Sequence, residues 1–366
     1  MTNDIINRFS EKLPDSYDYL AETPEEAAGR LMMVGWAGQD SGEIRDLIDE
    51  FRPGGLIFFR RNYPNRLKYY QDKYPLSQDL FAPELFGEVI VKVKKYCLRM
   101  VGRSLIVAVD QEGGKVFRLP TPFFQLPSAR EMGMLEIEET RRLAERVGQE
   151  LKESGFNLNL APVLDLDSLK DGYIGSRSFG VEPEKVIKYA SAFMTGLLNA
   201  GILSCGKHFP GLGGAVVDPH VGVPEIEWDI DQLSVGLNIF RRMIELGLPA
   251  IMTTHAFYPV LDQDQLATFS KPIVGLLRKE LGFEGLLLTD DLEMGAIVSY
   301  QDPGLAAVQA IMAGHDLILV CRDIEVIRSA YKAILAAINN NQITRERLVE
   351  SALRYKRFME LTRNQP

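Results

Sequence analysis

Apolar, β-branched runs alternate with longer amphipathic stretches along most of the chain. Eight runs have an apolar body and, in most cases, a polar, glycine-rich or charged end. They lie at residues 30–38, 54–62, 104–114, 156–167, 202–211, 249–257, 285–294 and 316–323. Continuous apolar runs of this kind are typical of β-strands that are covered on both faces.

Between these runs, apolar residues recur with the period of an α-helix. The clearest helical patterns cover residues 182–201, 231–247, 323–340 and 344–361. Leu233, Phe240 and Ile244 fall on one face of the second pattern, as in a helix that packs against a sheet. The first pattern ends on Gly201, a common helix stop signal.

Strand–helix alternation repeated eight times indicates parallel strands. In a chain of 366 residues it favours a (β/α)8 barrel of the TIM type, and the alternative is a doubly wound open sheet. We expect residues 1–366 to form one domain, with the barrel core over about 30–360. Residues 63–98 are long for one strand–helix connection, so we expect an insertion near Tyr74–Glu84.

The composition excludes several function classes. With 46% hydrophobic and 25% charged residues the chain is an ordinary globular protein. The net charge of −9 argues against general nucleic-acid binding, and no apolar run approaches the roughly 18 residues of a membrane span. The polar, acidic start argues against a signal peptide, and the widely spaced Cys97, Cys205 and Cys321 favour a reducing compartment. We therefore expect a cytoplasmic protein with no nucleic-acid or membrane partner. A monomer is the expected state, although none of these features bears on it.

Polar side chains gather where the strand-like runs end. In a (β/α)8 barrel the carboxyl ends of the strands build the active site. The candidates are Asp110, Gln111, Glu112, Asp165, Asp167, Lys207, His208, His255, Asp290 and Asp291. Carboxylates, a lysine and histidines on one rim predict a pocket for a polar, hydroxyl-rich ligand.

Some of these residues also have a purely structural interpretation. Asp291 can cap the next helix as well as bind a ligand, and His255 can be a wall residue or a ligand contact. His315 precedes its strand at the opposite rim, and we interpret it as structural. Trp36 and Met33 are interpreted as core residues.

The segment CGKHFPGLGGAVVDPH, residues 205–220, concentrates ionisable groups on a glycine-rich stretch. The spacing of His208 and His220 is not that of a metal site, and Lys207 would repel a cation, so we expect no metal. The GLGG sequence is similar to a backbone anion nest. It lacks the Lys-Ser/Thr ending of a phosphate-binding P-loop.

Four segments together resemble glycoside hydrolase family 3. They are AVDQEGGKVFRL (108–119), GSRSFG (175–180), GKHFPGLGGAVVDPH (206–220) and LLLTDDLEMGAI (286–297), in the order in which the family has them. Within the family, the resemblance is greatest to single-domain bacterial β-N-acetylhexosaminidases of peptidoglycan recycling.

This resemblance implies a retaining glycosidase on a (β/α)8 barrel, acting on a carbohydrate without a cofactor. Asp290 corresponds to the nucleophile of the family, and His220, with Asp218 behind it, corresponds to the general acid/base. Histidine, with an ordinary pKa near 6.5, can serve as acid and base in turn near neutrality. The sugar-binding residues of the family map onto Asp110, Arg118, Arg177, Lys207 and His208. Many larger family members take the proton donor from a domain after the barrel, whereas we expect it here within the barrel.

The sequence departs from the family pattern at three positions of this loop. Leu212 replaces a histidine, Gly214 an aspartate and Pro219 a serine. Pro219 restricts its own backbone and that of Asp218, so we expect a stiffer loop. These departures bear on the natural substrate more than on the type of reaction.

The expected function is an exo-β-N-acetylglucosaminidase that removes non-reducing terminal β-GlcNAc from muropeptide fragments. Two alternatives stay open: a β-glucosidase or β-xylosidase of the same family, and a catalytically inactive sugar-binding protein. The sequence does not distinguish hydrolysis from phosphorolysis.

Overall fold

Eight parallel strands close into a barrel. The computed structural model describes residues 18–38, 41–62, 83–121, 123–169 and 172–363. The barrel strands are β1 (Met32–Val34), β2 (Gly55–Phe58), β3 (Ile106–Val109), β6 (Leu158–Asn159), β7 (Leu203–Phe209), β8 (Ala250–Thr253), β9 (Leu286–Asp291) and β10 (Leu317–Val320). β1 pairs in parallel with both β2 and β10, which closes the sheet. The prediction of a (β/α)8 barrel is confirmed, and the open-sheet alternative is wrong.

Each barrel strand lies inside one of the predicted runs but is shorter than the run. Residues 104–114 contain β3 and also β4 (Gln111–Gly113), which forms an antiparallel hairpin with β5 (Val116–Phe117). At the end of β6, one side-chain amide adds to the backbone hydrogen bonds that link this strand to the β3 side. The side chain of Asn159 accepts a hydrogen bond from the Gln111 amide and donates one to its carbonyl, both at 3.0 Å.

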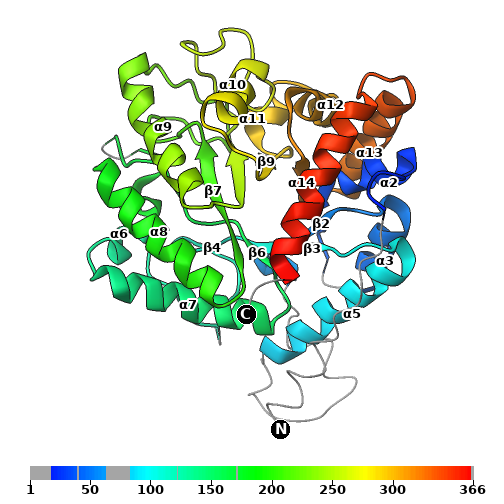
Figure 1. Cartoon of the computed structure of the whole chain (residues 1–366), viewed down its shortest axis with the longest axis horizontal. Helices are drawn as coiled ribbons and strands as arrows, with labels where there is room; N and C mark the ends of the chain where they lie inside the picture. Colours follow the sequence, from blue (N-terminus) through cyan, green and yellow to red (C-terminus); the bar gives the residue numbers. More distant parts are fainter. Residues whose placement is uncertain (1–17, 39–40, 63–82, 122, 170–171, 364–366) are drawn as a thin grey trace.

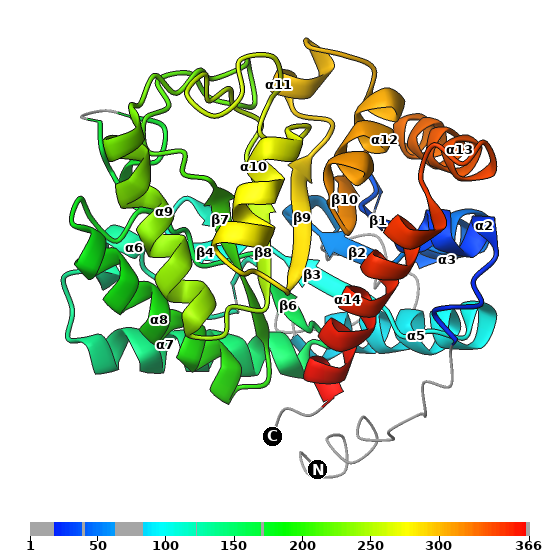
Figure 2. The same cartoon turned by 45° about the horizontal axis from the view of Figure 1, so that its top comes forward.

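Helices surround the barrel (Figures 1 and 2). The longer ones are α2 (Pro24–Arg30), α3 (Ser41–Phe51), α5 (Pro83–Val101), α7 (Ile137–Glu153), α8 (Pro183–Asn199), α9 (Ile230–Glu245), α12 (Pro303–Ala313), α13 (Ile324–Asn339) and α14 (Arg345–Arg363). Shorter ones are η1 (Arg60–Asn62), α6 (Ala129–Met132), η2 (Gly175–Arg177), α10 (Lys271–Gly275), η3 (Leu276–Glu280) and α11 (Gly295–Val298). The four predicted helical patterns are confirmed as α8, α9, α13 and α14. Among the described residues, no helix has the length and apolarity needed to cross a membrane.

The insertion expected near Tyr74–Glu84 lies outside the described residues except for the start of α5. Gly201 follows the C-cap of α8 with a φ of 78°, which agrees with its expected role as a stop signal. Met33 and Trp36 are buried core residues, as predicted. Met33 belongs to the barrel interior, whereas Trp36 packs edge-on against Phe58 in the layer between barrel and helices.

Helix α14 covers the amino-terminal end of the barrel. Tyr355 and Phe358 pack with the apolar residues of the barrel interior. The Tyr355 hydroxyl donates to the carbonyls of Gly54 at 2.6 Å and Ser104 at 3.0 Å, just before β2 and β3. The opposite, carboxyl-terminal mouth of the barrel is therefore the one left for a substrate.

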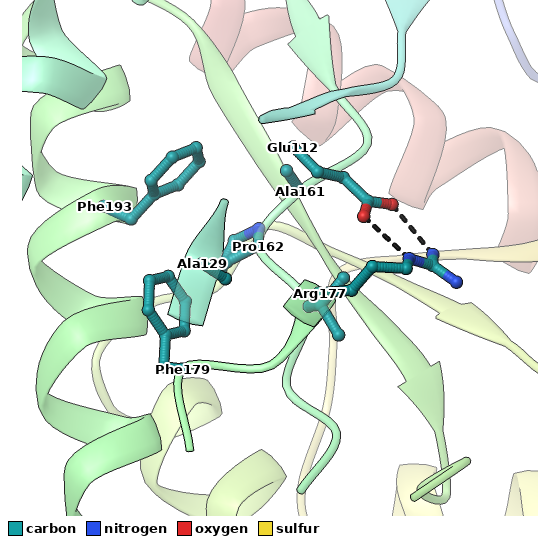
Figure 3. Close-up of a pocket in the computed structure, with 8 residues that line it drawn as sticks. Glu112, Ala129, Ala161, Pro162, Arg177, Phe179 and Phe193 are labelled. Atoms are coloured by element: carbon teal, nitrogen blue, oxygen red, sulfur yellow. Dashed lines mark hydrogen bonds and ion pairs between the residues drawn. The ribbon is translucent and has the colours of Figure 1, made fainter. Parts of the chain in front are cut away.

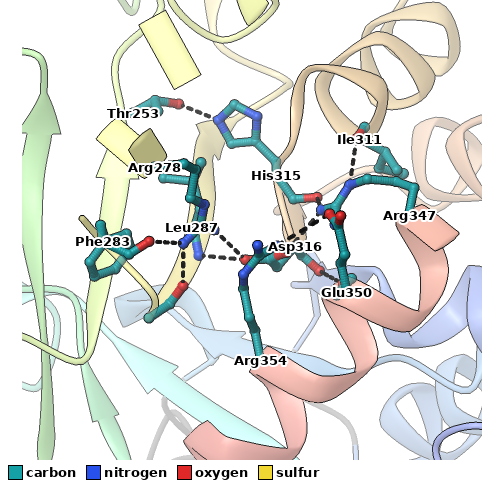
Figure 4. A network of polar contacts seen from close by, with 12 residues as sticks. Thr253, Arg278, Phe283, Leu287, Ile311, His315, Asp316, Arg347, Glu350 and Arg354 are labelled. Carbon is teal, nitrogen blue, oxygen red and sulfur yellow. Dashed lines mark hydrogen bonds and ion pairs between the residues drawn. The ribbon is translucent and has the colours of Figure 1, made fainter. Parts of the chain in front are cut away.

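A buried carboxylate anchors α14 to the rest of the barrel (Figure 4). Asp316 accepts hydrogen bonds from Arg278 at 2.6 Å, from Arg347 at 2.8 Å and from Arg354 at 3.2 Å. The neighbouring His315 is buried and lies 2.9 Å from the Thr253 hydroxyl. Burial lowers the pKa of His315 to about 3, so the ring is neutral. Its position before β10, away from the carboxyl-terminal mouth, agrees with the predicted structural role.

Candidate active site

Three basic side chains of the predicted sugar-binding set pair with carboxylates at the carboxyl ends of the strands. The ammonium of Lys207, in β7, lies 2.7 Å from Asp110 Oδ1 and 2.6 Å from Glu112 Oε1. Arg118 Nη2 lies 3.8 Å from the other carboxylate oxygen of Asp110. Arg177 closes the set through Glu112. The structure thus brings together residues that are far apart in the sequence.

Glu112 and Arg177 form a buried, bidentate ion pair (Figure 3). Arg177 Nε and Nη2 each donate to a different oxygen of Glu112 at 2.9 Å. Burial would raise the pKa of Glu112, but Arg177 and Lys207 hold it well below its ordinary value. Glu112 is therefore a permanent anion that fixes both cations in place. Glu112 was among the strand-end candidates predicted from the sequence, but no role was predicted for it.

His208 lies between Arg177 and Asp165. Arginine can only donate, so His208 Nε2, 3.2 Å from Arg177 Nη2, accepts. The proton of the neutral ring is then on Nδ1, which donates to Asp165 Oδ2 at 2.6 Å. Asp165 also accepts the amide of Leu212 at 2.6 Å, so one carboxylate fixes both the ring and the start of the loop after β7.

Asp290 and Asp291 are adjacent at the end of β9 but have different surroundings. Burial would raise the pKa of Asp290, but the positive charge of Lys207 and the hydrogen bond from the Asp291 amide are among the influences that lower it, so its carboxylate is ionised at neutral pH. Asp291 instead accepts the Glu293 amide at 3.1 Å, and burial with Glu293 and Asp290 raises its pKa to about 7. Of these two neighbouring carboxylates, Asp290 is therefore the one that is held as an anion.

Asp218 and His220 form a hydrogen-bonded pair on the loop after β7. Asp218 Oδ1 lies 2.8 Å from His220 Nδ1 and also accepts the His220 amide at 2.9 Å. Both side chains are solvent-accessible, with 45% and 60% of their surface exposed. Nε2 of His220 has no hydrogen-bond partner among the described residues, so it is the nitrogen available to exchange a proton with a substrate.

Tyr173 links this pair to the sugar-binding residues and was not predicted from the sequence. Its hydroxyl lies 3.4 Å from His220 Nδ1, and the guanidinium of Arg177 lies over its ring at 5.4 Å. Burial raises its pKa to about 12, and the nearby Asp290 and Asp218 add to the effect. The sequence feature that could have pointed to Tyr173 is its position just before the GSRSFG segment.

Three other candidates lie around the site rather than in it. His255 is buried and donates from Nε2 to the Asp291 carbonyl at 3.0 Å, while burial lowers its pKa. Both of its ring nitrogens thus bond within the protein, one of them at the end of β9. The side-chain oxygen of Gln111 accepts hydrogen bonds from the backbone amides of Arg118 and Leu119. These bonds hold the hairpin of β4 and β5 in place. Asp167 pairs with Arg130, away from the other candidates.

Two of the three sequence departures are explained by packing. A Cβ at Gly214 would lie 2.8 Å from the indole of Trp228, so the aspartate of the family pattern does not fit. The side chain of Leu212 is buried, and its backbone amide donates a hydrogen bond to the carboxylate of Asp165. Trp228 and Leu212 thus replace polar side chains with apolar packing in the first part of the loop.

Within the described part of the chain, no group of three or more His, Cys, Asp or Glu side chains is arranged to hold a metal ion. The expectation of a site without metal or cofactor stays a prediction. Cys97, Cys205 and Cys321 are buried and free. Burial raises the pKa of Cys97 to about 11 and that of Cys205 and Cys321 further, so the three thiols are protonated at neutral pH.

A family model describes the same region. The model of the glycosyl hydrolase family 3 N-terminal domain matches residues 23–358. The chain belongs to glycoside hydrolase family 3. This membership confirms the resemblance drawn from the four sequence segments.

Curated relatives agree with this family membership. The chain is 36% identical over 283 residues to a protein named beta-hexosaminidase from Nitrosomonas eutropha, which covers 74% of each chain. It is 32% identical over 310 residues to a beta-hexosaminidase from Pseudomonas aeruginosa, which covers 83% of this chain and 84% of that protein.

Solved structures of the family have the same fold. A family 3 β-N-acetylglucosaminidase from a Paenibacillus species superposes with a TM-score of 0.86 at 33% identity. That alignment covers 93% of this chain but 63% of the longer Paenibacillus protein. A β-N-acetylhexosaminidase from Beutenbergia cavernae gives a TM-score of 0.81 at 28% identity and covers 92% and 98% of the two chains.

Proposed function

We propose that this glycoside hydrolase is a retaining exo-β-N-acetylglucosaminidase. The observation that carries the proposal is the combination of an ionised Asp290 among the sugar-binding candidates with an exposed Asp218–His220 pair. The two relatives named beta-hexosaminidase support an N-acetylhexosamine as the sugar that is released.

In the first step, Asp290 attacks the anomeric carbon of the terminal sugar. The glycosidic bond breaks as His220 Nε2 donates its proton to the leaving oxygen. The products are a covalent ester between the sugar and Asp290, and a free alcohol. Asp218 accepts the hydrogen bond from Nδ1, which keeps the ring in the tautomer needed next and stabilises its charged form.

In the second step, His220 removes a proton from water as the water attacks the same carbon. The ester bond to Asp290 breaks, and the sugar leaves with its original configuration. Asp110, Arg118, Arg177, Lys207 and His208 would hold the hydroxyl groups of the sugar throughout. Charge-assisted hydrogen bonds of this kind contribute about 1.5–3 kcal/mol each.

A panel of p-nitrophenyl β-glycosides tests the proposal directly. The β-GlcNAc derivative should be cleaved with a kcat/KM at least about tenfold above that of the β-glucoside and β-xyloside. Equal values would favour the β-glucosidase or β-xylosidase alternative, and no cleavage of any derivative would favour the sugar-binding protein. A cytoplasmic location, a monomeric state and muropeptide substrates stay predictions.

A further inference from the structure

The surface around His220 can be assigned to the leaving group. In the proposed reaction, which this inference rests on, His220 protonates the oxygen that links the two sugars. The second sugar, or aglycone, must therefore lie beside the loop that carries Asp218 and His220. Side chains that surround this pair decide which aglycones fit.

Exposed valines flank the pair on both sides. Val216 and Val221 are 83% and 78% exposed, and Val217 is 42% exposed. Val298, in the helix α11 on which the loop lies, is 58% exposed. Large apolar side chains are rarely left this accessible in such a group without a contact that covers them.

The loops on the same side of the barrel mouth also lack basic side chains. Residues 208–240, 243–270 and 280–321, which include the loops after β7, β8 and β9, contain no lysine or arginine. The loop after β7 instead contains exposed acidic side chains, among them Glu225 and Glu227.

The basic residues of the sugar-binding set do not make up for the missing lysines and arginines. Lys207 contacts Asp110 and Glu112, Arg177 is paired with Glu112, and Arg118 lies near Asp110. Each of these three cations thus already faces a carboxylate. The described loops of the aglycone side therefore present apolar and anionic groups to a substrate, and apart from His220 itself they offer no basic side chain to bind an acidic group.

We propose that the aglycone side of the site selects an uncharged sugar, such as a second N-acetylglucosamine, over a muramic acid with an ionised lactyl carboxylate. The valines cover the apolar face of the second sugar, and the acidic loop repels a carboxylate. This selectivity runs against the expectation of muropeptide substrates, which came from the family resemblance alone.

Matched disaccharides isolate the effect of charge. GlcNAc-β-1,4-MurNAc is compared with the same disaccharide carrying a carboxamide in place of the lactyl carboxylate, and with GlcNAc-β-1,4-GlcNAc. The two uncharged substrates should have a kcat/KM at least about fivefold above that of the carboxylate at low salt, with a smaller ratio at about 0.5 M salt. A carboxylate substrate cleaved as fast as its carboxamide would overturn the proposal.

Variants test where the selectivity comes from. Val217→Lys and Val221→Lys add a cation beside the pair and should lower the carboxamide-to-carboxylate ratio about threefold. Val235→Lys adds the same cation at a 39%-exposed valine on α9 and should leave the ratio unchanged. A ratio that neither loop variant moves would also overturn the proposal. Failure to cleave even p-nitrophenyl β-GlcNAc would instead refute the proposed function on which it rests.

Discussion

The backbone amide of Gly295 donates a hydrogen bond to the carbonyl of His220 at 3.2 Å. The next amide, of Ala296, donates to the carbonyl of Pro219 at 3.0 Å. The first turn of α11, just beyond the strand that carries Asp290, therefore supports the loop that carries His220. A Cβ at position 295 would lie 2.4 Å from the His220 carbonyl oxygen, so this close approach requires glycine.

Gly295→Ala should displace the loop without unfolding the protein. We expect kcat for a GlcNAc disaccharide, whose leaving group needs a proton, to fall by about 10- to 100-fold. The p-nitrophenyl substrate should lose much less. Gly275→Ala is the matched control, because no atom lies within 4 Å of the place that its new methyl group would take. Equal kinetics for both variants would show that docking onto α11 does not matter for catalysis.

A 2-fluoro or 5-fluoro glycosyl inhibitor should label Asp290. The adjacent Asp291 has a pKa raised to about 7 and accepts the Glu293 amide, so it is the poorer nucleophile and is turned to other partners. Peptide mass spectrometry of the trapped enzyme identifies the modified residue. A label on Asp291 would reverse the assignment of the two carboxylates.

His220→Ala should slow substrates with poor leaving groups by roughly 10²–10⁴-fold. A nitrophenolate leaves with little help from a proton, so hydrolysis of the intermediate should become rate-limiting for that substrate. Azide needs no general base and should restore part of the rate with formation of the β-glycosyl azide. Asp218→Asn should show the same behaviour in a milder form. Near wild-type turnover of disaccharides by His220→Ala would exclude this residue as the acid.

Pro219→Ser tests the departure from the family pattern within this loop. The carbonyl of Pro219 already accepts the Ala296 amide, so the loop has a second restraint that a serine leaves in place. We expect kcat to change by only a few-fold and the pH dependence of kcat/KM to stay the same. A shifted pH profile would mean that the proline sets the environment of His220 rather than the stiffness of the loop.

Arg177→Ala should both raise KM and destabilise the fold. It leaves Glu112 buried with Lys207 as its remaining partner, which should cost about 3 kcal/mol of unfolding free energy. Adding Glu112→Gln removes the carboxylate that has lost its arginine partner. The double variant should regain part of the stability, but its KM should stay raised. Recovery of KM together with stability would show that Arg177 only supports the fold.

Asp291 should make stability depend on pH. Its pKa is raised to about 7 in the folded protein, chiefly by burial, above the ordinary value of 3.8. Between these values the folded state binds more protons than the unfolded state, so this group's contribution to stability falls as pH rises. Asp291→Asn should therefore gain stability relative to the wild type between about pH 4 and pH 7.5, measured by urea denaturation. A constant difference across this range would contradict the raised pKa.

The sequence by itself determined the barrel and most of the candidate site. Apolar runs at regular intervals identify parallel strands because both faces of each strand must be buried. Asp110, Lys207, His208 and Asp290 could be found because the carboxyl end of every strand in such a barrel faces the same mouth. The pairing of Asp218 with His220 was implied by the family resemblance, and it needs only a local contact across one intervening residue.

Only the tertiary structure decided which of these groups meet. Glu112 and Arg177 are 65 positions apart along the chain, and a buried ion pair between them depends on how β4 and the turn η2 are placed. Tyr173 and Gly295 lie in or beside the family segments, but their residue types do not reveal what they contact. Their roles arise because separate loops pack against the same His220, and a sequence pattern records the residue types but not the contacts between distant loops.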